Sequence, residues 1–179
     1  MKLAPAVASL SLALAFAWGF AEATFFFIVP DVLLTRFALR DLRRGLFGAV
    51  AATGGALLGA SLLWWLAARD IGPVLRLIER LPGIPLSLVT TTGQAVQADG
   101  ASALWLGAIF GQPYKLFVAH AAAQGLGFWS FMGVSAAARL SRFAATTLLA
   151  AWVARFLVSP GRRIQVHILF WVGFYAVYY

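Results

Sequence analysis

Long apolar runs separated by short polar or basic stretches dominate the hydropathy pattern of this chain. The runs cover residues 5–29, Leu46 to Ala68, Ala101 to Phe110, Leu116 to Ala123, Phe128 to Val158 and Ile164 to Tyr179. They exceed what a soluble core of this length requires, and the runs of about 20 residues are long enough for helices that cross a bilayer. The pattern therefore predicts an all-α integral membrane protein.

The stretch from Phe20 to Leu34 contains two acids, Glu22 and Asp31, in an otherwise apolar setting. A carboxylate at membrane depth costs roughly 2.5 to 3.5 kcal/mol on insertion scales, so such a residue normally faces a protein interior or a wet cavity. Pro30 disfavours helix at Val29 and lacks a backbone donor. We therefore expect a re-entrant hairpin with an acidic tip. A secretory signal over residues 1–23 fits less well, because the apolar run continues through Val29.

The run from Leu46 to Ala68 predicts the clearest spanning helix. Gly55 and Gly59 form a GxxxG pair, which allows another helix backbone to approach closely. The pair suits packing within one chain and equally leaves a homodimer open.

Between residues 70 and 100 the chain is more polar. Residues Pro73 to Leu81 place apolar side chains on one helical side and charged ones opposite, which predicts a short helix lying on the membrane surface. The polar stretch from Thr90 to Gly100 is expected to form a loop.

A second broken segment is expected over residues 101–123, because Gly111-Gln112-Pro113-Tyr114-Lys115 interrupts the apolar run and carries a charge. Broken helices at corresponding places in two halves indicate a transporter-like site. In the following helix, Arg139 and Arg142 are three residues apart and share one face.

These elements predict one membrane domain over residues 1–179. It comprises a first re-entrant half over about 5–68, an interfacial helix and loop over about 70–100, a second re-entrant half over about 101–158, and a C-terminal helix over 164–179. In all, two hairpins face each other beside about three transmembrane helices. This arrangement puts Lys2, the basic cluster at 36–44 and Arg162 and Arg163 on one side, which the positive-inside rule makes cytoplasmic.

Composition supports a membrane setting: 62% of the 179 residues are hydrophobic and 11% are charged, and the mean hydropathy is +0.86. The net charge of +8 comes from basic residues that flank apolar runs. Anionic lipid headgroups are therefore the expected partners, and nucleic acid is not. The chain has no cysteine, which excludes disulfides and thiolate chemistry.

No catalytic or metal site is expected. His120 and His167 lie far apart in sequence without a carboxylate at ligand spacing. Ser135 and Ser141 have no base beside them in sequence, so we expect neither an enzyme nor a cofactor.

Four segments together resemble the DedA family, within the SNARE-associated (VTT domain) membrane-protein superfamily. They are FAEATFFFIVPD (20–31), GGALLGASLLWWL (54–66), GQPYKLFVAHAAA (111–123) and SAAARLSRF (135–143). The first is similar to the family's acidic hairpin and the last to its Arg-x-x-Arg-Phe pattern. The resemblance implies a flippase or scramblase that moves phospholipid or polyprenyl phosphate between the leaflets of a bacterial inner membrane, with proton coupling proposed for some members.

The residues suggest a compatible mechanism. Guanidinium groups can hold a lipid phosphate through paired hydrogen bonds, so Arg139 and Arg142 are the expected phosphate ligands. Glu22 and Asp31 would compete for those arginines when deprotonated, and Lys115 completes the expected substrate and proton-coupling set. Two alternatives stay open. One is a proton-coupled exporter of small cationic compounds, and the other is a non-transporting membrane-integrity protein in which the same charges form a structural network.

Overall fold

The computed structural model describes residues 5–178, and side chains from residue 9 to residue 177. Lys2, which enters the topology argument, and Tyr179 at the end of the predicted C-terminal helix lie outside the described residues. All regular structure in the described part is helical, as predicted. The α-helices are α1 (Pro5–Thr24), α2 (Asp31–Ala38), α3 (Leu42–Arg69), α4 (Ile71–Glu79), α5 (Leu86–Asp99), α6 (Ala103–Ile109), α7 (Tyr114–Ala123), α8 (Phe128–Phe156) and α9 (Arg163–Tyr178), with 3-10 turns at Gly100–Ser102 and Pro160–Arg162.

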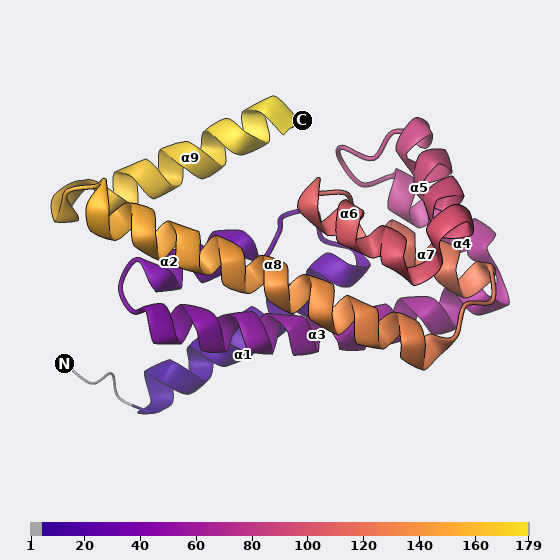
Figure 1. Cartoon of the computed structure of the whole chain (residues 1–179), viewed down its shortest axis with the longest axis horizontal. Helices are drawn as coiled ribbons and strands as arrows, with labels where there is room; N and C mark the ends of the chain where they lie inside the picture. The colour runs from indigo at the N-terminus through magenta and orange to yellow at the C-terminus, as the bar shows by residue number, and fades with distance from the viewer. Residues whose placement is uncertain (1–4, 179) are drawn as a thin grey trace.

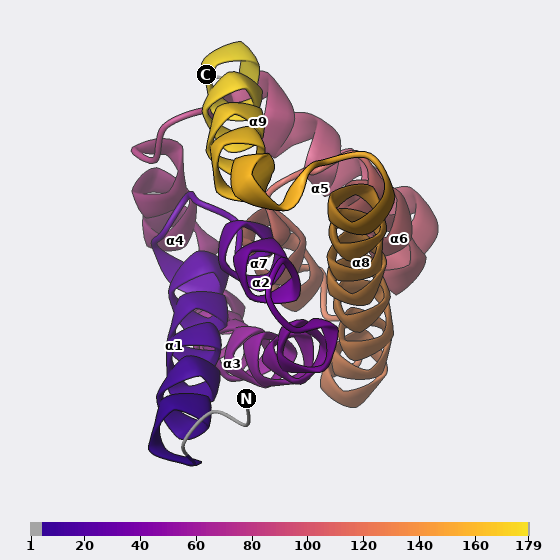
Figure 2. The same cartoon turned by 90° about the vertical axis from the view of Figure 1, so that its left-hand side faces the viewer.

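Two long helices, α3 and α8, run antiparallel along the length of the molecule (Figure 1). Helix α1 packs along α3, whereas α4 to α7 gather at one end of the molecule. Helix α9 turns back along the side of the molecule that lies opposite α1. In the end-on view the short helices α2 and α7 lie centrally, surrounded by α1, α3, α8 and α9 (Figure 2). The second halves of both interrupted segments therefore occupy the interior.

Glycines let α1 and α3 touch backbone to backbone. A Cβ added at Gly55 would lie 1.9 Å from the Phe16 carbonyl oxygen, and one at Gly19 would lie 2.0 Å from the Ala52 carbonyl oxygen. At Gly59 the corresponding distance to the Phe20 carbonyl oxygen is 2.8 Å. The GxxxG pair thus faces α1 of the same chain, and this contact needs glycine because no side chain fits.

Both predicted interruptions of the helices are present. Helix α1 ends at Thr24, six residues before Pro30, and α2 begins directly after that proline. The second interruption lies between α6 and α7, where Gly111 adopts a left-handed φ of 71° and the Gln112 N–H donates to the Gly107 carbonyl. Glycine therefore ends α6, whereas the first break comes earlier than the one expected at Val29-Pro30 and the proline stands at the start of α2.

The predicted loop from Thr90 to Gly100 is wrong, because α5 covers Leu86–Asp99. Val89, Thr92 and Val96 are buried on one side of this helix. Threonine hydroxyls bond to carbonyls one turn earlier, as in the 2.7 Å bond from Thr92 to Leu88. With Thr92 counted as a buried position, the stretch has the spacing of a helix with one buried face. The polar composition of the stretch made this spacing hard to recognise from sequence.

The predicted spanning helix is longer than expected. Helix α3 begins at Leu42 instead of Leu46, because the Asp41 side chain accepts from the backbone N–H groups of Arg43 and Arg44 and caps the helix. Within the described residues, α3 is the one helix that is long and apolar enough to cross a membrane by length and composition.

The predicted short helix over residues 73–81 is present as α4. Val74 and Ile78 are buried, while Arg76, Glu79 and Arg80 are exposed. The buried side chains join the same core cluster as Leu116 and Phe117 of α7. The apolar side of α4 therefore packs into the protein.

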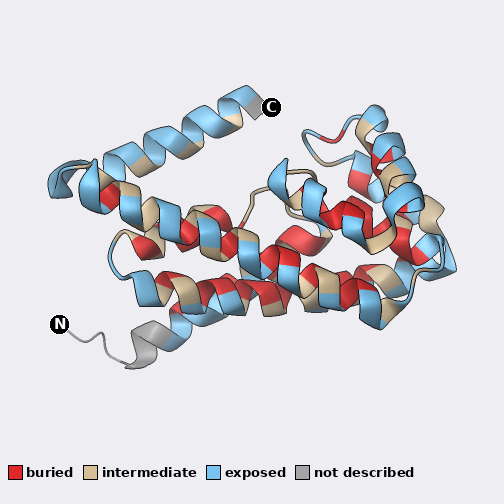
Figure 3. Ribbon diagram, viewed as in Figure 1, coloured by how far each residue is buried: buried red, intermediate tan, exposed pale blue. Residues whose placement is uncertain are grey.

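Large apolar side chains cover much of the outer surface of α3, α8 and α9. Figure 3 shows the outward faces of these helices as exposed. On α3 they include Phe47, Leu58 and Trp65, each more than half exposed, and on α9 they include Leu169 and Phe170. An apolar surface of this extent marks contact with a partner or a membrane.

Candidate functional site

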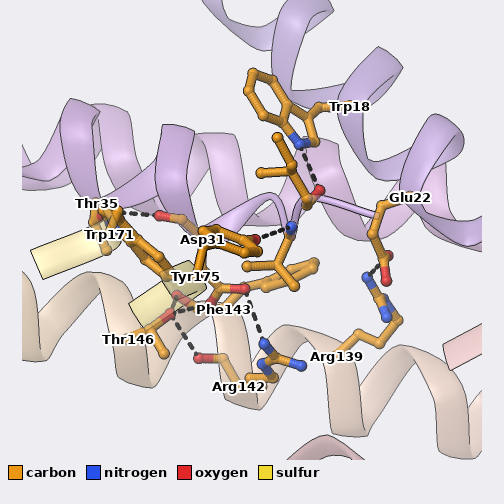
Figure 4. A network of polar contacts seen from close by, with 12 residues as sticks. Trp18, Glu22, Asp31, Thr35, Arg139, Arg142, Phe143, Thr146, Trp171 and Tyr175 are labelled. Atoms are coloured by element: carbon orange, nitrogen blue, oxygen red, sulfur yellow. Dashed lines mark hydrogen bonds and ion pairs between the residues drawn. The ribbon is translucent and has the colours of Figure 1, made fainter. Parts of the chain in front are cut away.

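Glu22 and Arg139 form an ion pair inside the protein. Glu22 lies near the end of α1 and Arg139 in the middle of α8, and each residue is only 5% exposed (Figure 4). The guanidinium carbon of Arg139 also lies 4.3 Å from the ring centroid of Tyr114 and 4.8 Å from that of Phe143. Two aromatic faces and one carboxylate therefore surround this buried cation.

Asp31 forms the second ion pair with Arg142, one turn further along α8. An Arg142 guanidinium nitrogen lies 3.3 Å from Oδ2 of Asp31, and the Thr146 hydroxyl donates to Oδ1 at 2.6 Å. Asp31 is the first residue of α2 and is 1% exposed. A carboxylate in the first turn of a helix is favoured by the helix dipole, which helps to hold this charge inside the protein.

Lys115 contributes a third buried cation, from the first turn of α7. It is 2% exposed, and its ammonium donates to the Phe26 carbonyl at 3.0 Å. That carbonyl belongs to the interruption between α1 and α2, so Lys115 connects the two broken segments. Neither ion pair of the described residues includes Lys115.

The interruption between α1 and α2 has several backbone groups satisfied by side chains from other elements. Besides the Lys115 contact, the Trp18 indole donates to the Ile28 carbonyl at 3.0 Å and the Val29 N–H donates to the Tyr175 hydroxyl at 2.9 Å. Figure 4 shows the Trp18 and Tyr175 bonds on opposite sides of this segment. Non-helical backbone inside an apolar protein needs such partners.

A small pocket of about 40 Å³ lies where the two interruptions meet. Glu22, Val29, Gly111, Lys115 and Arg142 are among the residues that line it. This volume holds about three or four water molecules, given that roughly 10–15 Å³ of such volume holds one. The site is therefore small, polar and enclosed by apolar protein.

The five charged residues predicted from sequence all lie in this region. Three cations, Lys115, Arg139 and Arg142, face two anions, Glu22 and Asp31, so the formal charge of the group is one positive unit. Of the five, Arg142 is the most accessible, with 22% of its side chain exposed, whereas Asp31 opposite it is 1% exposed. The group can hold an anion near Lys115 and Arg142 without further basic residues.

Sequence reasoning missed several polar residues of the site. Thr146 lies four residues after Arg142 on the same helical face, a spacing that could have identified it. Tyr114 adjoins Lys115 in sequence, but its stacking on Arg139 depends on the fold. Trp18 and Tyr175, at opposite ends of the chain, gave no local signal.

A metal site is not evident. The described residues contain no group of three or more histidine, aspartate or glutamate side chains that could hold a metal ion. Ser135 is buried in α8 and Ser141 is exposed on the same helix.

Comparisons with known proteins gave no match: no protein-family model, no curated protein and no solved structure is similar to this chain. The resemblance to the DedA family, seen in four short motifs, therefore stays a prediction.

Proposed function

We propose that this chain is an integral membrane protein in which the two interrupted segments enter the bilayer as re-entrant hairpins. The length and composition of α3 and the exposed apolar faces of α3, α8 and α9 support this placement. Irregular backbone at membrane depth is tolerated only where protein or a wet cavity surrounds it. The partners supplied by Trp18, Lys115 and Tyr175 meet that condition for the first interruption.

In this setting, the proposed function is the movement of an anionic lipid, a phospholipid or a polyprenyl phosphate, between leaflets. The observation that carries it is the excess cation. Lys115 is buried beside two complete ion pairs, at a pocket that also reaches Glu22 and Arg142. Lys115 forms no ion pair in the described part of the chain, and the group carries one positive charge in excess of its two acids, which supports a ligand of opposite charge.

The carboxylates would regulate access to this site. When ionised, Asp31 and Glu22 occupy the guanidinium groups of Arg142 and Arg139. When either acid takes up a proton, its arginine becomes available to a phosphate, which it can bind through two parallel hydrogen bonds. Transport by this scheme is proton-coupled. The five charged residues all lie within the DedA-like motifs, and this resemblance supports the same function.

A second candidate is a structural role, in which the charges hold the two hairpins together. The two ion pairs and the Thr146 bond favour it, because each acid has a basic partner in the fold. It accounts for Lys115 through its bond to the Phe26 carbonyl, which joins the two interruptions but does not require a positive charge. An exporter of cationic compounds is less favoured, because the group carries excess positive charge.

The test is leaflet exchange of fluorescent phospholipids and of a polyprenyl phosphate in liposomes that contain the purified protein. We expect exchange by the wild type, its loss in Arg142→Ala, and in Glu22→Gln a much reduced exchange whose dependence on pH differs from that of the wild type. Arg155→Ala, an exposed arginine at the end of α8, is the matched control and should retain exchange. A folded wild-type protein that exchanges none of these lipids would favour the structural role.

A further inference from the structure

A large groove lies beside the small polar pocket, between α8 on one side and α2, α6 and α9 on the other. Its volume is about 740 Å³, within the roughly 300–1,000 Å³ range of small-molecule sites. Trp105, Leu149, Val153, Phe170 and Trp171 are among the apolar residues that line it. The function proposed above makes no use of this space.

Three residues line both spaces, Gly111, Arg142 and Phe174, and of these only Arg142 is charged. Arg142 lines the small polar pocket and also the apolar groove, and it is the most accessible of the five charged residues. Asp31 and Thr146, its neighbours in the second ion pair, line the groove as well. The groove is therefore mostly apolar, with Arg142 and Asp31 at one end and a second cation, Arg163 of α9, towards the other.

The shape of the groove limits what can occupy it. Along α8 its lining runs from Arg142 to Ala154, 12 residues or about 18 Å at 1.5 Å per residue, and it continues to Val158 after the helix ends. An extended hydrocarbon chain is long and thin enough to follow this space.

We infer that this groove binds one hydrocarbon chain of the anionic lipid, with the lipid phosphate at Arg142 next to the polar pocket. This inference rests on the proposed function, since it names how the same substrate is held. The Arg142 end adjoins the polar pocket and its third cation, Lys115, which sets the orientation: the anionic head lies at the junction of the two spaces and the chain extends along α8 towards Val158. The aromatic side chains of α9 cover the chain from outside.

The test uses a probe of defined chemistry, hexadecyl phosphate with a photoactivatable diazirine in the middle of its chain. After irradiation with the detergent-purified protein, intact mass and peptide mapping report how much probe is attached and where. Wild-type protein should be labelled on α8 or α9 within the groove. Excess unlabelled hexadecyl phosphate should compete, and the trimethylammonium analogue with the same chain should not.

Two alanines of α8 provide a matched pair of variants. Ala145 is exposed and lines the groove, whereas Ala137 is exposed and is not among the residues that line it. Ala145→Trp fills the groove and should reduce labelling about tenfold, which corresponds to about 1.4 kcal/mol of lost binding. Ala137→Trp should label like the wild type.

The outcomes separate this inference from the proposed function. Labelling spread along the outer surface, unaffected by Ala145→Trp, or equal for the cationic analogue overturns the groove assignment, even if leaflet exchange is observed. Specific groove labelling in a protein that exchanges no lipid supports the groove and overturns transport. A groove that a second protein chain occupies, so that the probe does not attach there, overturns the inference as well.

Discussion

The ammonium of Lys115 and the backbone carbonyl of Phe26 are 3.0 Å apart, although the two residues are separated by 89 positions in sequence. Phe26 lies in the interruption between α1 and α2, and Lys115 lies in the first turn after the interruption between α6 and α7. This hydrogen bond joins the two irregular segments at the point where the charged residues gather. The arrangement leads to the following predictions.

Removal of the negative charge at Glu22 should destabilise the fold. Glu22→Gln leaves the buried guanidinium of Arg139 without a counter-ion, and breaking one side of a buried pair costs about 3–5 kcal/mol. Thermal unfolding in detergent should show a clear decrease in Tm. The double variant Glu22→Gln/Arg139→Gln should recover part of the loss, because it also removes the uncompensated cation.

The control for this measurement is Glu79→Gln, since Glu79 is exposed on α4. Exposed substitutions usually change the free energy of unfolding by no more than about 0.5 kcal/mol. Equal effects of Glu22→Gln and Glu79→Gln would contradict a buried ion pair.

Thr146 should matter through its hydroxyl. Thr146→Val keeps the shape of the side chain but removes the 2.6 Å bond to Asp31, which leaves a buried carboxylate oxygen unsatisfied at a cost of about 1–3 kcal/mol. Thr146→Ser should restore most of the stability in chemical denaturation. Thr91→Val, at an exposed position of α5, is the control and should have little effect.

The close contact of α1 and α3 should tolerate no side chain at Gly55. Gly55→Ala places a methyl group against the Phe16 backbone, and overpacking of this kind costs about 1–3 kcal/mol or more. Gly133→Ala is the matched control, because Gly133 lies in α8 with no neighbouring atom within 4 Å of the added Cβ. There we expect a gain of about 0.5–1 kcal/mol from the better helix propensity of alanine. The two substitutions should therefore shift Tm in opposite directions, and similar shifts would contradict the packing described.

How much of this could be predicted from sequence differs between elements. The helix interruptions before Pro30 and at Gly111 were predictable, because proline restricts the backbone and glycine readily adopts the left-handed φ that ends a helix. The α5 helix was not recognised, since Thr90, Thr91 and Thr92 suggested a loop until the fold buried one of them. Local chemistry thus identified the breaks but not a helix whose stripe depends on packing.

The candidate site shows the same division. Buried charges in apolar runs identified all five members of the group without knowledge of the fold. Sequence could not tell which acid faces which arginine, because Glu22 and Arg139 are 117 positions apart and only the fold brings them together. The contacts of Tyr175 and Trp18 with the first interruption were invisible for the same reason.

Tyr175 should tie α9 to the first interruption. Tyr175→Phe removes the hydroxyl that accepts from the Val29 N–H, so the hydrogen exchange of that amide should become about tenfold faster, which corresponds to about 1.4 kcal/mol. Exchange measured by mass spectrometry over residues 25–30 would detect this change. Val172→Ala, at a largely exposed position of α9, should leave the exchange rate as it is in the wild type.

Leaflet exchange by Lys115→Met tests the central claim most directly, because Lys115 belongs to neither ion pair. Loss of its charge relieves a buried ammonium and also removes one hydrogen bond, so stability should change by no more than about 1 kcal/mol. With a fluorescent anionic phospholipid in liposomes, we predict that exchange falls about tenfold, equivalent to about 1.4 kcal/mol in the barrier, while Tm is maintained and Arg155→Met behaves like the wild type. A stably folded Lys115→Met protein that exchanges lipid at the wild-type rate would contradict the account.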